Sequence, residues 1–327
     1  MSGPIADLSY RNYDGPLEPP MYRWWAIARV GIMKAFGNKW FWVFTVAGGF
    51  WYVILMIIFY FVDSFAGAIP TRGRNPVVDP AKAAETLFKQ VKWDEQFLHA
   101  FSMGQLWFFV IALLVGLGTI ANDNRANALL VYLSKPCTKL DYIVGKWVGI
   151  FIPTLVAVAI PTFFFFGYCF MSYRKDGFLD DPWLILRLVV LVTLPAIFHS
   201  SLAIGVSSMF KQGRVAGATY AGFYFFTLFF TKAMGAVHIV LSQNGGTPGL
   251  VDNLFYCSID GIQIGLAKVI LQSDGGRIFP LPGPGTDLSR FVVPAPNGFL
   301  MTFGFLLISG LFVLIAHSRV RAVEVVR

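Results

Sequence analysis

Residues that could carry catalytic or metal chemistry are few and lie far apart in this sequence. No histidine stands in an H-E-x-x-H pattern, so no zinc protease site is indicated; the four are His99, His199, His238 and His317. Ser200 and Ser201 follow His199, but no G-x-S-x-G turn exposes either hydroxyl as a nucleophile. The G-x-x-x-x-G-K-[ST] loop that cradles nucleotide phosphates is also absent from the sequence. We therefore expect no enzyme activity, resident cofactor or metal site.

The cysteines and the first residues add no processing or redox signal. Cys137, Cys169 and Cys257 are isolated, and an odd count without C-x-x-C spacing argues against a disulfide framework. Residues 1–20 are polar and lack the apolar segment of a signal peptide. We expect them to form a poorly ordered cytoplasmic arm.

The composition is that of a membrane protein. The 327 residues are 56% hydrophobic and 13% charged, where soluble domains have roughly 25% charged residues. Since a helix rises ~1.5 Å per residue, apolar runs of about 20 residues cross a ~30 Å hydrocarbon core. The net charge of +8 is scattered between these runs, which indicates orientation and contact with anionic lipids rather than nucleic acid binding.

Six apolar runs predict an all-α membrane protein with six transmembrane helices. Their approximate ranges are 40–62, 97–121, 147–170, 183–210, 215–242 and 298–316. They form one transmembrane domain over residues 40–316, followed by a tail at 317–327. Before them, residues 21–39 mix tryptophans with four cations, which is typical of a helix in the headgroup region. The alternative is a cytoplasmic extension of the first span.

The distribution of Lys and Arg favours both termini inside. With that orientation the inner segments hold 14 Lys and Arg in 79 residues, and the outer ones 10 in 101. The outer segment 243–297 is long for a simple connection. Within it, residues 251–272 (VDNLFYCSIDGIQIGLAKVILQ) are apolar but interrupted by glycines, which favours a re-entrant or interfacial helix, followed by a turn region at 280–285.

Residues 122–146, between the second and third spans, predict two short helices. Asn122 or Asp123 can cap the first, because their side-chain oxygens accept from unpaired helical N–H groups. An apolar stripe then recurs at helical spacing, at Ala126, Leu129, Leu130 and Leu133. Pro136 ends this helix after Ser134-Lys135. A capping box at Thr138–Asp141 starts a second helix that continues into the third span.

The apolar stripe of the first helix needs a surface to cover it. It can lie on the bilayer, or it can dock in a groove on a soluble partner. The residues alone leave both possibilities open.

The segment resembles the cytoplasmic coupling segment of type 2 ATP-binding cassette (ABC) exporter permeases. The resemblance rests on Asp123, Arg125, Leu129, Leu133-Ser134-Lys135-Pro136, Thr138-Lys139, Tyr142 and Gly145-Lys146. One departure is Asn127-Ala128, where the family usually has Gly-Thr. The N-terminal interfacial helix and six spans also agree with this family.

The resemblance implies a permease subunit of an exporter in a bacterial cytoplasmic membrane. It would pair with a second permease copy, as a homodimer or related heterodimer. A separate ABC ATPase subunit would hold ATP and Mg. The residues implied in ATPase coupling are Asp123, Arg125, Ala126, Leu129, Leu130, Leu133, Lys135 and Pro136. A subunit of the same fold that anchors or mechanically drives a larger complex is the alternative, and a standalone transporter or membrane enzyme leaves the coupling segment unexplained.

Two ionisable residues fall inside predicted spans, where charge is costly. His199 lies near the middle of the fourth span, and Lys232 lies deep in the fifth. They are candidates for a translocation path or gate. The other interpretation is that His199 hydrogen-bonds a neighbouring helix and Lys232 reaches the headgroups. Gly213 and Gly217 have the spacing of close helix contacts, between subunits or within the chain.

Overall fold

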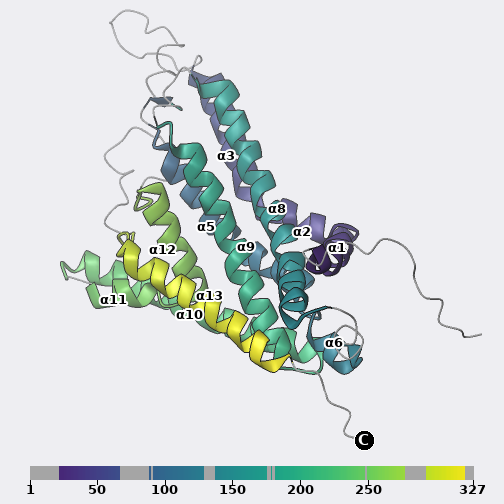
Figure 1. Cartoon of the computed structure of the whole chain (residues 1–327). Coiled ribbons are helices and arrows are strands. Elements are labelled where there is room, and N and C mark those ends of the chain that lie inside the picture. Colours follow the sequence, from purple (N-terminus) through teal and green to yellow (C-terminus); the bar gives the residue numbers. More distant parts are fainter. Residues whose placement is uncertain are drawn as a thin grey trace, which may run out of the picture.

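The computed structural model describes residues 22–66, 88–89, 91–128, 137–174, 178, 181–246, 249–276 and 292–320. Every regular element within these ranges is a helix (Figure 1). The helices are α1 (Arg23–Phe36), α2 (Lys39–Gly48), α3 (Phe50–Ala66), α5 (Trp93–Gly116), α6 (Ala121–Arg125), α8 (Lys139–Tyr173), α9 (Leu184–Ser208), α10 (Gly213–Gln243), α11 (Gly249–Phe255), α12 (Ile259–Leu271) and α13 (Gly298–Arg319). The arm at 1–20, the turn region at 280–285 and residues 129–136 lie outside the described residues.

The lengths and compositions of the helices confirm the all-α membrane class. Five helical stretches in the described part are long and apolar enough to cross a membrane: Trp93–Arg125, α8, α9, α10 and α13. Two bent pairs pass the same test, α2 with α3 at 46° and α11 with α12 at 106°. Together they give between five and seven candidate spans, each close to an apolar run predicted from the sequence.

The bend between α2 and α3 falls at a pair of glycines that other helices approach closely. A Cβ on Gly49 would lie 2.6 Å from Cβ of Pro161 in α8. A Cβ on Gly48 would lie 3.3 Å from Cβ of Trp107 in α5. The first predicted span is therefore bent at Gly48 and Gly49, where two neighbouring helices leave no room for side chains.

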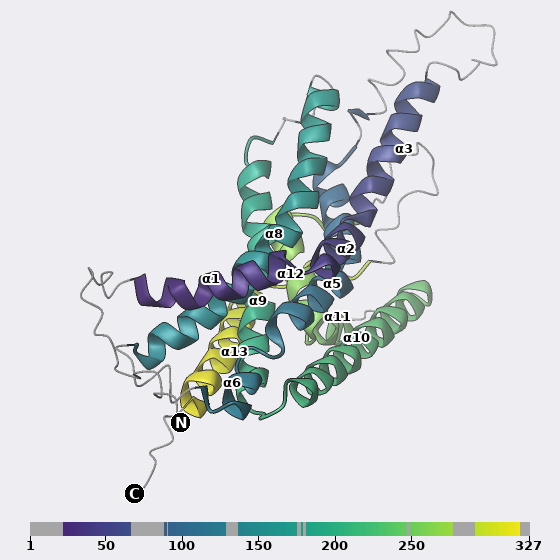
Figure 2. The ribbon, with the colours of Figure 1, turned by 90° about the vertical axis from the view of Figure 1, so that its right-hand side faces the viewer.

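Helix α1 packs closely along the first turns of α8 (Figure 2). Small residues permit this close approach: a Cβ on Gly31 would lie 3.2 Å from Cα of Gly149, and Ala28 is completely buried. The opposite side of α1 exposes Trp25 and Met33. A helix that packs along the start of a spanning helix and exposes aromatic, apolar and basic side chains fits the predicted position at the membrane surface.

Helix α9 is the most buried of the spanning helices. Of its most apolar 18-residue window, 78% is buried, whereas α10 and α13 bury 17% and 22% of theirs. The exposed faces of those two helices present large apolar side chains such as Phe226, Phe229 and Leu314. Because exposure of large apolar side chains to water is unfavourable, these faces are suited to contact with lipid or with another subunit.

The glycines at the start of α10 pack within the chain. A Cβ on Gly213 would lie 2.9 Å from Oδ1 of Asn122, and a Cβ on Gly217 would lie 3.0 Å from Cδ1 of Leu117. These glycines therefore make close contacts with neighbouring residues of the same chain.

Candidate functional site

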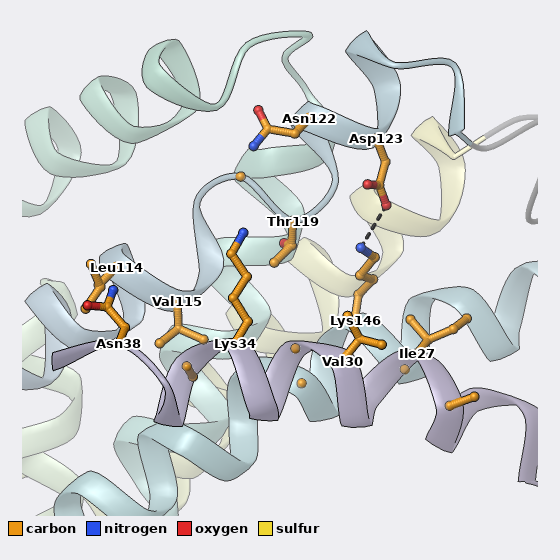
Figure 3. A pocket seen from close by; sticks show the side chains of 16 residues that line it. Ile27, Val30, Lys34, Asn38, Leu114, Val115, Thr119, Asn122, Asp123 and Lys146 are labelled. Carbon is orange, nitrogen blue, oxygen red and sulfur yellow. Dashed lines mark ion pairs between the residues drawn. The ribbon is translucent and has the colours of Figure 1, made fainter. Parts of the chain in front are cut away.

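The first part of the site is an ion pair that joins the two helices of the segment 122–146. Asp123 in α6 and Lys146 in α8 lie 2.8 Å apart, between Oδ2 and Nζ (Figure 3). The hydroxyl of Tyr142 donates to the same Oδ2 at 2.7 Å. Both charged side chains are largely buried, with 16% of Lys146 and 19% of Asp123 exposed. The structure therefore brings together three residues that the sequence placed in one segment.

Helix α6 differs from its prediction. Asn122 and Asp123 lie inside the helix instead of capping it, since α6 begins at Ala121. It ends at Arg125, and Asn127 has a φ of 51°, so the helix predicted to continue from Asn122 through Leu133 is interrupted. Asp123 does not cap the helix, because its carboxylate binds Lys146 and Tyr142, and the left-handed backbone of Asn127 ends the helix after its C-cap Ala126.

Tertiary contacts replace the predicted cap of α6. The backbone N–H groups of Ile120 and Ala121 donate to Oγ of Ser207 at 3.2 and 3.0 Å. The side-chain amide of Asn124 donates to the carbonyl of Phe210 at 3.4 Å. Because Ser207 is in the last turn of α9, α6 is joined to α9 as well as to α8.

The predicted capping box at Thr138 is confirmed. Oγ1 of Thr138 accepts from the N–H of Asp141 at 3.1 Å, and the N–H of Thr138 donates to Oδ2 of Asp141 at 2.9 Å. The helix that it starts, α8, is 35 residues long and continues through Pro153 and Pro161. The second helix of the segment and the third predicted span thus form one continuous helix, α8. Residues 129–136 between the two helices, with Leu129, Leu130, Leu133, Lys135 and Pro136, lie outside the described residues.

A second polar cluster lies within the spanning helices, around His199. This side chain is completely buried in α9. Its Nδ1 lies 2.7 Å from the hydroxyl of Tyr220 in α10, and its Nε2 lies 3.2 Å from Nε2 of Gln263 in α12. An amide that donates to Nε2 leaves the proton of the neutral ring on Nδ1, which donates to Tyr220. His199 therefore hydrogen-bonds two neighbouring helices.

The cluster continues one turn further to Asp260. The hydroxyl of Tyr224 donates to Oδ2 of Asp260 at 3.1 Å, and the ring of Tyr224 stacks on Phe109 of α5 at 3.8 Å. Lys232 lies exposed on α10.

Sequence reasoning missed the partners of His199 and the roles of Asp260 and Ser207. Asp260 could have been identified from the sequence, since an ionisable residue inside the apolar run 251–272 indicates a functional or hydrogen-bonded position. Tyr220, Gln263 and Ser207 carried no such signal, since their partners are remote in the sequence.

Comparison with protein families gives a match that covers nearly the whole chain. Residues 25–319 match the family described as ABC-2 family transporter protein. A search among curated proteins returned no match. The matched range contains all the helices from α2 to α13, most of α1, and the segment that holds Asp123 and Lys146. The chain belongs to the ABC-2 transporter family, whose members are membrane components of ABC transporters.

Proposed function

We propose that this chain is the permease subunit of an ABC exporter in a bacterial cytoplasmic membrane. In this proposal the bent pair α2–α3 forms the first of six spans, and α5, α8, α9, α10 and α13 form the others. The pair α11–α12 enters from the outer side and returns. Both termini are cytoplasmic, in agreement with the excess of Lys and Arg in the inner segments.

A separate ABC ATPase subunit supplies the energy, with ATP and Mg bound there. A second permease copy completes the transporter. The segment 122–146 docks on the ATPase, with the stripe of Leu129, Leu130 and Leu133 in an apolar groove and Arg125 and Lys135 beside it. Movement of the ATPase then displaces this segment.

The observation that carries the proposal is the attachment of α6 to two spanning helices at once. The ion pair of Asp123 with Lys146 joins α6 to α8, and the hydroxyl of Ser207 joins it to α9. Both contacts are direct, so a displacement of this short helix is transmitted to both spanning helices. An anchoring subunit without a substrate would use the same attachment, so the transport role needs its own test.

Association with the ATPase tests the coupling role. Replacement of Leu129 and Leu130 by Asp removes apolar burial worth roughly 1.5–3 kcal/mol per side chain and puts two charges into a dry contact. We expect this variant to insert in the membrane and to lose the ATPase during purification. Asn127→Asp is the matched control for an added charge. Retention of the ATPase by the double variant at the wild-type level would refute the coupling role.

Reconstitution separates transport from anchoring. A purified complex with a molecule bound between two permease copies, released on ATP hydrolysis, favours the exporter. A complex that hydrolyses ATP with that space occupied by a further protein subunit favours the anchoring role.

A further inference from the structure

A cavity of about 610 Å³ lies between α1, α5, α6 and α8. This volume falls within the range of roughly 300–1,000 Å³ that is usual for small-ligand sites. Its lining is polar on one side, with Lys34, Thr119, Asn122 and the pair Asp123–Lys146, whereas Asn38 lies beside Leu114 (Figure 3). The other side is apolar. A ligand that satisfies both sides has a polar and an apolar end.

The polar side carries an excess of positive charge. The charged residues of the lining are Lys34, Lys146 and Asp123, and the last two neutralise each other at 2.8 Å. Lys34 has no acidic partner among the described residues, and its side chain extends from α1 toward Thr119 (Figure 3). One uncompensated ammonium group at this place favours an anionic ligand.

The apolar side is continuous with an exposed apolar surface. Ile27, Val30, Leu114 and Val115 line it. Val30 is 68% exposed and Leu114 is 38% exposed, and Met33 on the neighbouring turn of α1 is 62% exposed. A free phosphate ion would leave these side chains uncovered, whereas acyl chains would cover them.

We propose that this cavity binds an anionic phospholipid of the cytoplasmic leaflet. Its phosphate lies beside Lys34, and its acyl chains extend over Val30 and Leu114. The assignment to the cytoplasmic leaflet rests on the orientation in the proposed function. A basic site between helices near the headgroups fits this ligand, since cations at the membrane surface attract anionic lipids.

The position of the site gives the lipid a role beyond solvation. The headgroup lies against Asn122 and Asp123 of α6 and against Lys34 of α1 at the same time. Occupancy therefore connects the surface helix to the segment that meets the ATPase, and anionic lipid stabilises the joined arrangement.

Binding to the purified full-length permease tests the site without any ATPase, so its result is independent of the coupling role. Native mass spectrometry would compare phosphatidylglycerol with phosphatidylcholine of the same chain length. We expect wild type to prefer phosphatidylglycerol, and Lys34→Gln to bind it about fivefold more weakly. Lys34→Arg should bind as wild type. Arg29→Gln is the matched control, because Arg29 is exposed on the same helix and does not line the cavity.

Equal binding of the two lipids by wild type, or equal losses in Lys34→Gln and Arg29→Gln, would overturn the proposal. Displacement of phosphatidylglycerol by inorganic phosphate at millimolar concentration, with no effect of the acyl chains, would assign the cavity to a free anion instead. If Lys34→Gln does not fold, Leu114→Trp narrows the apolar side and keeps Lys34. It should lower phosphatidylglycerol binding, and unchanged binding in that variant would also refute the lipid site.

Discussion

Oδ2 of Asp123 accepts from both Nζ of Lys146 and the hydroxyl of Tyr142, at 2.8 and 2.7 Å. One carboxylate oxygen thus joins the helix after the second predicted span to the helix that becomes the third. Such a contact is stronger than an exposed ion pair, because both side chains are shielded from water and one oxygen binds two donors.

Loss of this contact should uncouple the permease from its ATPase. Asp123→Asn and Lys146→Gln each remove one charge of this partly buried ion pair, and we expect each to cost about 1–3 kcal/mol of stability. The stimulation of ATP hydrolysis by the permease should fall in parallel. Thermal unfolding of the purified permease and ATPase assays of the complex measure the two effects.

A charge exchange separates the ion pair from the general loss of a side chain. The double variant Asp123→Lys with Lys146→Asp should lose less stability than the sum of the losses in Asp123→Lys and Lys146→Asp alone, and Tyr142 limits the recovery because its hydroxyl loses an acceptor. Lys211→Gln, at an exposed position, is the control for removing one cation. Additive effects in the double variant would refute the pairing.

The backbone of Asn127 gives a second prediction. Its φ of 51° lies in the left-handed region, where asparagine is tolerated and a β-branched residue is strained by about 1–3 kcal/mol. Asn127→Gly should therefore preserve ATPase association, and Asn127→Val should weaken it. Co-purification of the ATPase is the measurement. Asn127→Asp is the control, because aspartate also tolerates a positive φ, and equal losses in Asn127→Asp and Asn127→Val would contradict the prediction.

The backbone conformation of Asn127 also explains why this chain differs from the permease family that it resembles. Where the resembling family usually has Gly-Thr, this chain has Asn127-Ala128. Glycine and asparagine are the residues that most readily adopt a positive φ. The backbone geometry therefore accounts for the exchange, although sequence reasoning placed Asn127 inside a continuous helix.

Features set by local chemistry could be predicted from the sequence. The capping box at Thr138 and Asp141 depends on residues three apart, and the spanning helices depend on apolar runs of bilayer length. The tie between Ser207 and α6 could not, because its members are 86 and 87 residues apart. The same holds for His199 and Gln263, which are 64 residues apart. Tertiary packing determines such partners, and a single sequence does not reveal how the helices pack.

The buried hydrogen bond between His199 and Tyr220 gives a third prediction. Tyr220→Phe removes the acceptor of the imidazole proton and leaves a completely buried polar group without that partner. We expect it to lower the free energy of unfolding by about 1–3 kcal/mol. The double variant with His199→Phe should lose less than the sum of the two single losses. Thermal unfolding in detergent measures all three.

Tyr60→Phe is the matched control for this prediction, since Tyr60 is 63% exposed. It removes the same hydroxyl from a place where no buried partner depends on it, and its stability should stay near wild type. A Tyr220→Phe permease as stable as this control would show that the hydrogen bond contributes nothing.

The last prediction uses Cys137 as a native probe of orientation. Burial raises the pKa of the Cys137 thiol above its usual value, and the nearby carboxylate of Asp141 adds to the shift. Since the thiolate is the species that reacts with maleimide, labelling should be slow at neutral pH and should quicken about tenfold per pH unit below the pKa. The variant Cys169→Ser with Cys257→Ser leaves Cys137 as the single thiol. In permeabilised cells, an impermeant maleimide should label it at pH 8 faster than at pH 7.

In sealed cells the same reagent should spare Cys137 at both pH values, because the segment 122–146 faces the cytoplasm in the proposed orientation. A cysteine placed at Gly283 in the same background, in the outer turn region predicted from the sequence, should react from outside. The pH dependence in permeabilised cells shows that Cys137 is reactive, so its protection in sealed cells reports the membrane barrier and not burial. Labelling of Cys137 in sealed cells would reverse the orientation, and with it the proposal that residues 122–146 meet a cytoplasmic ATPase.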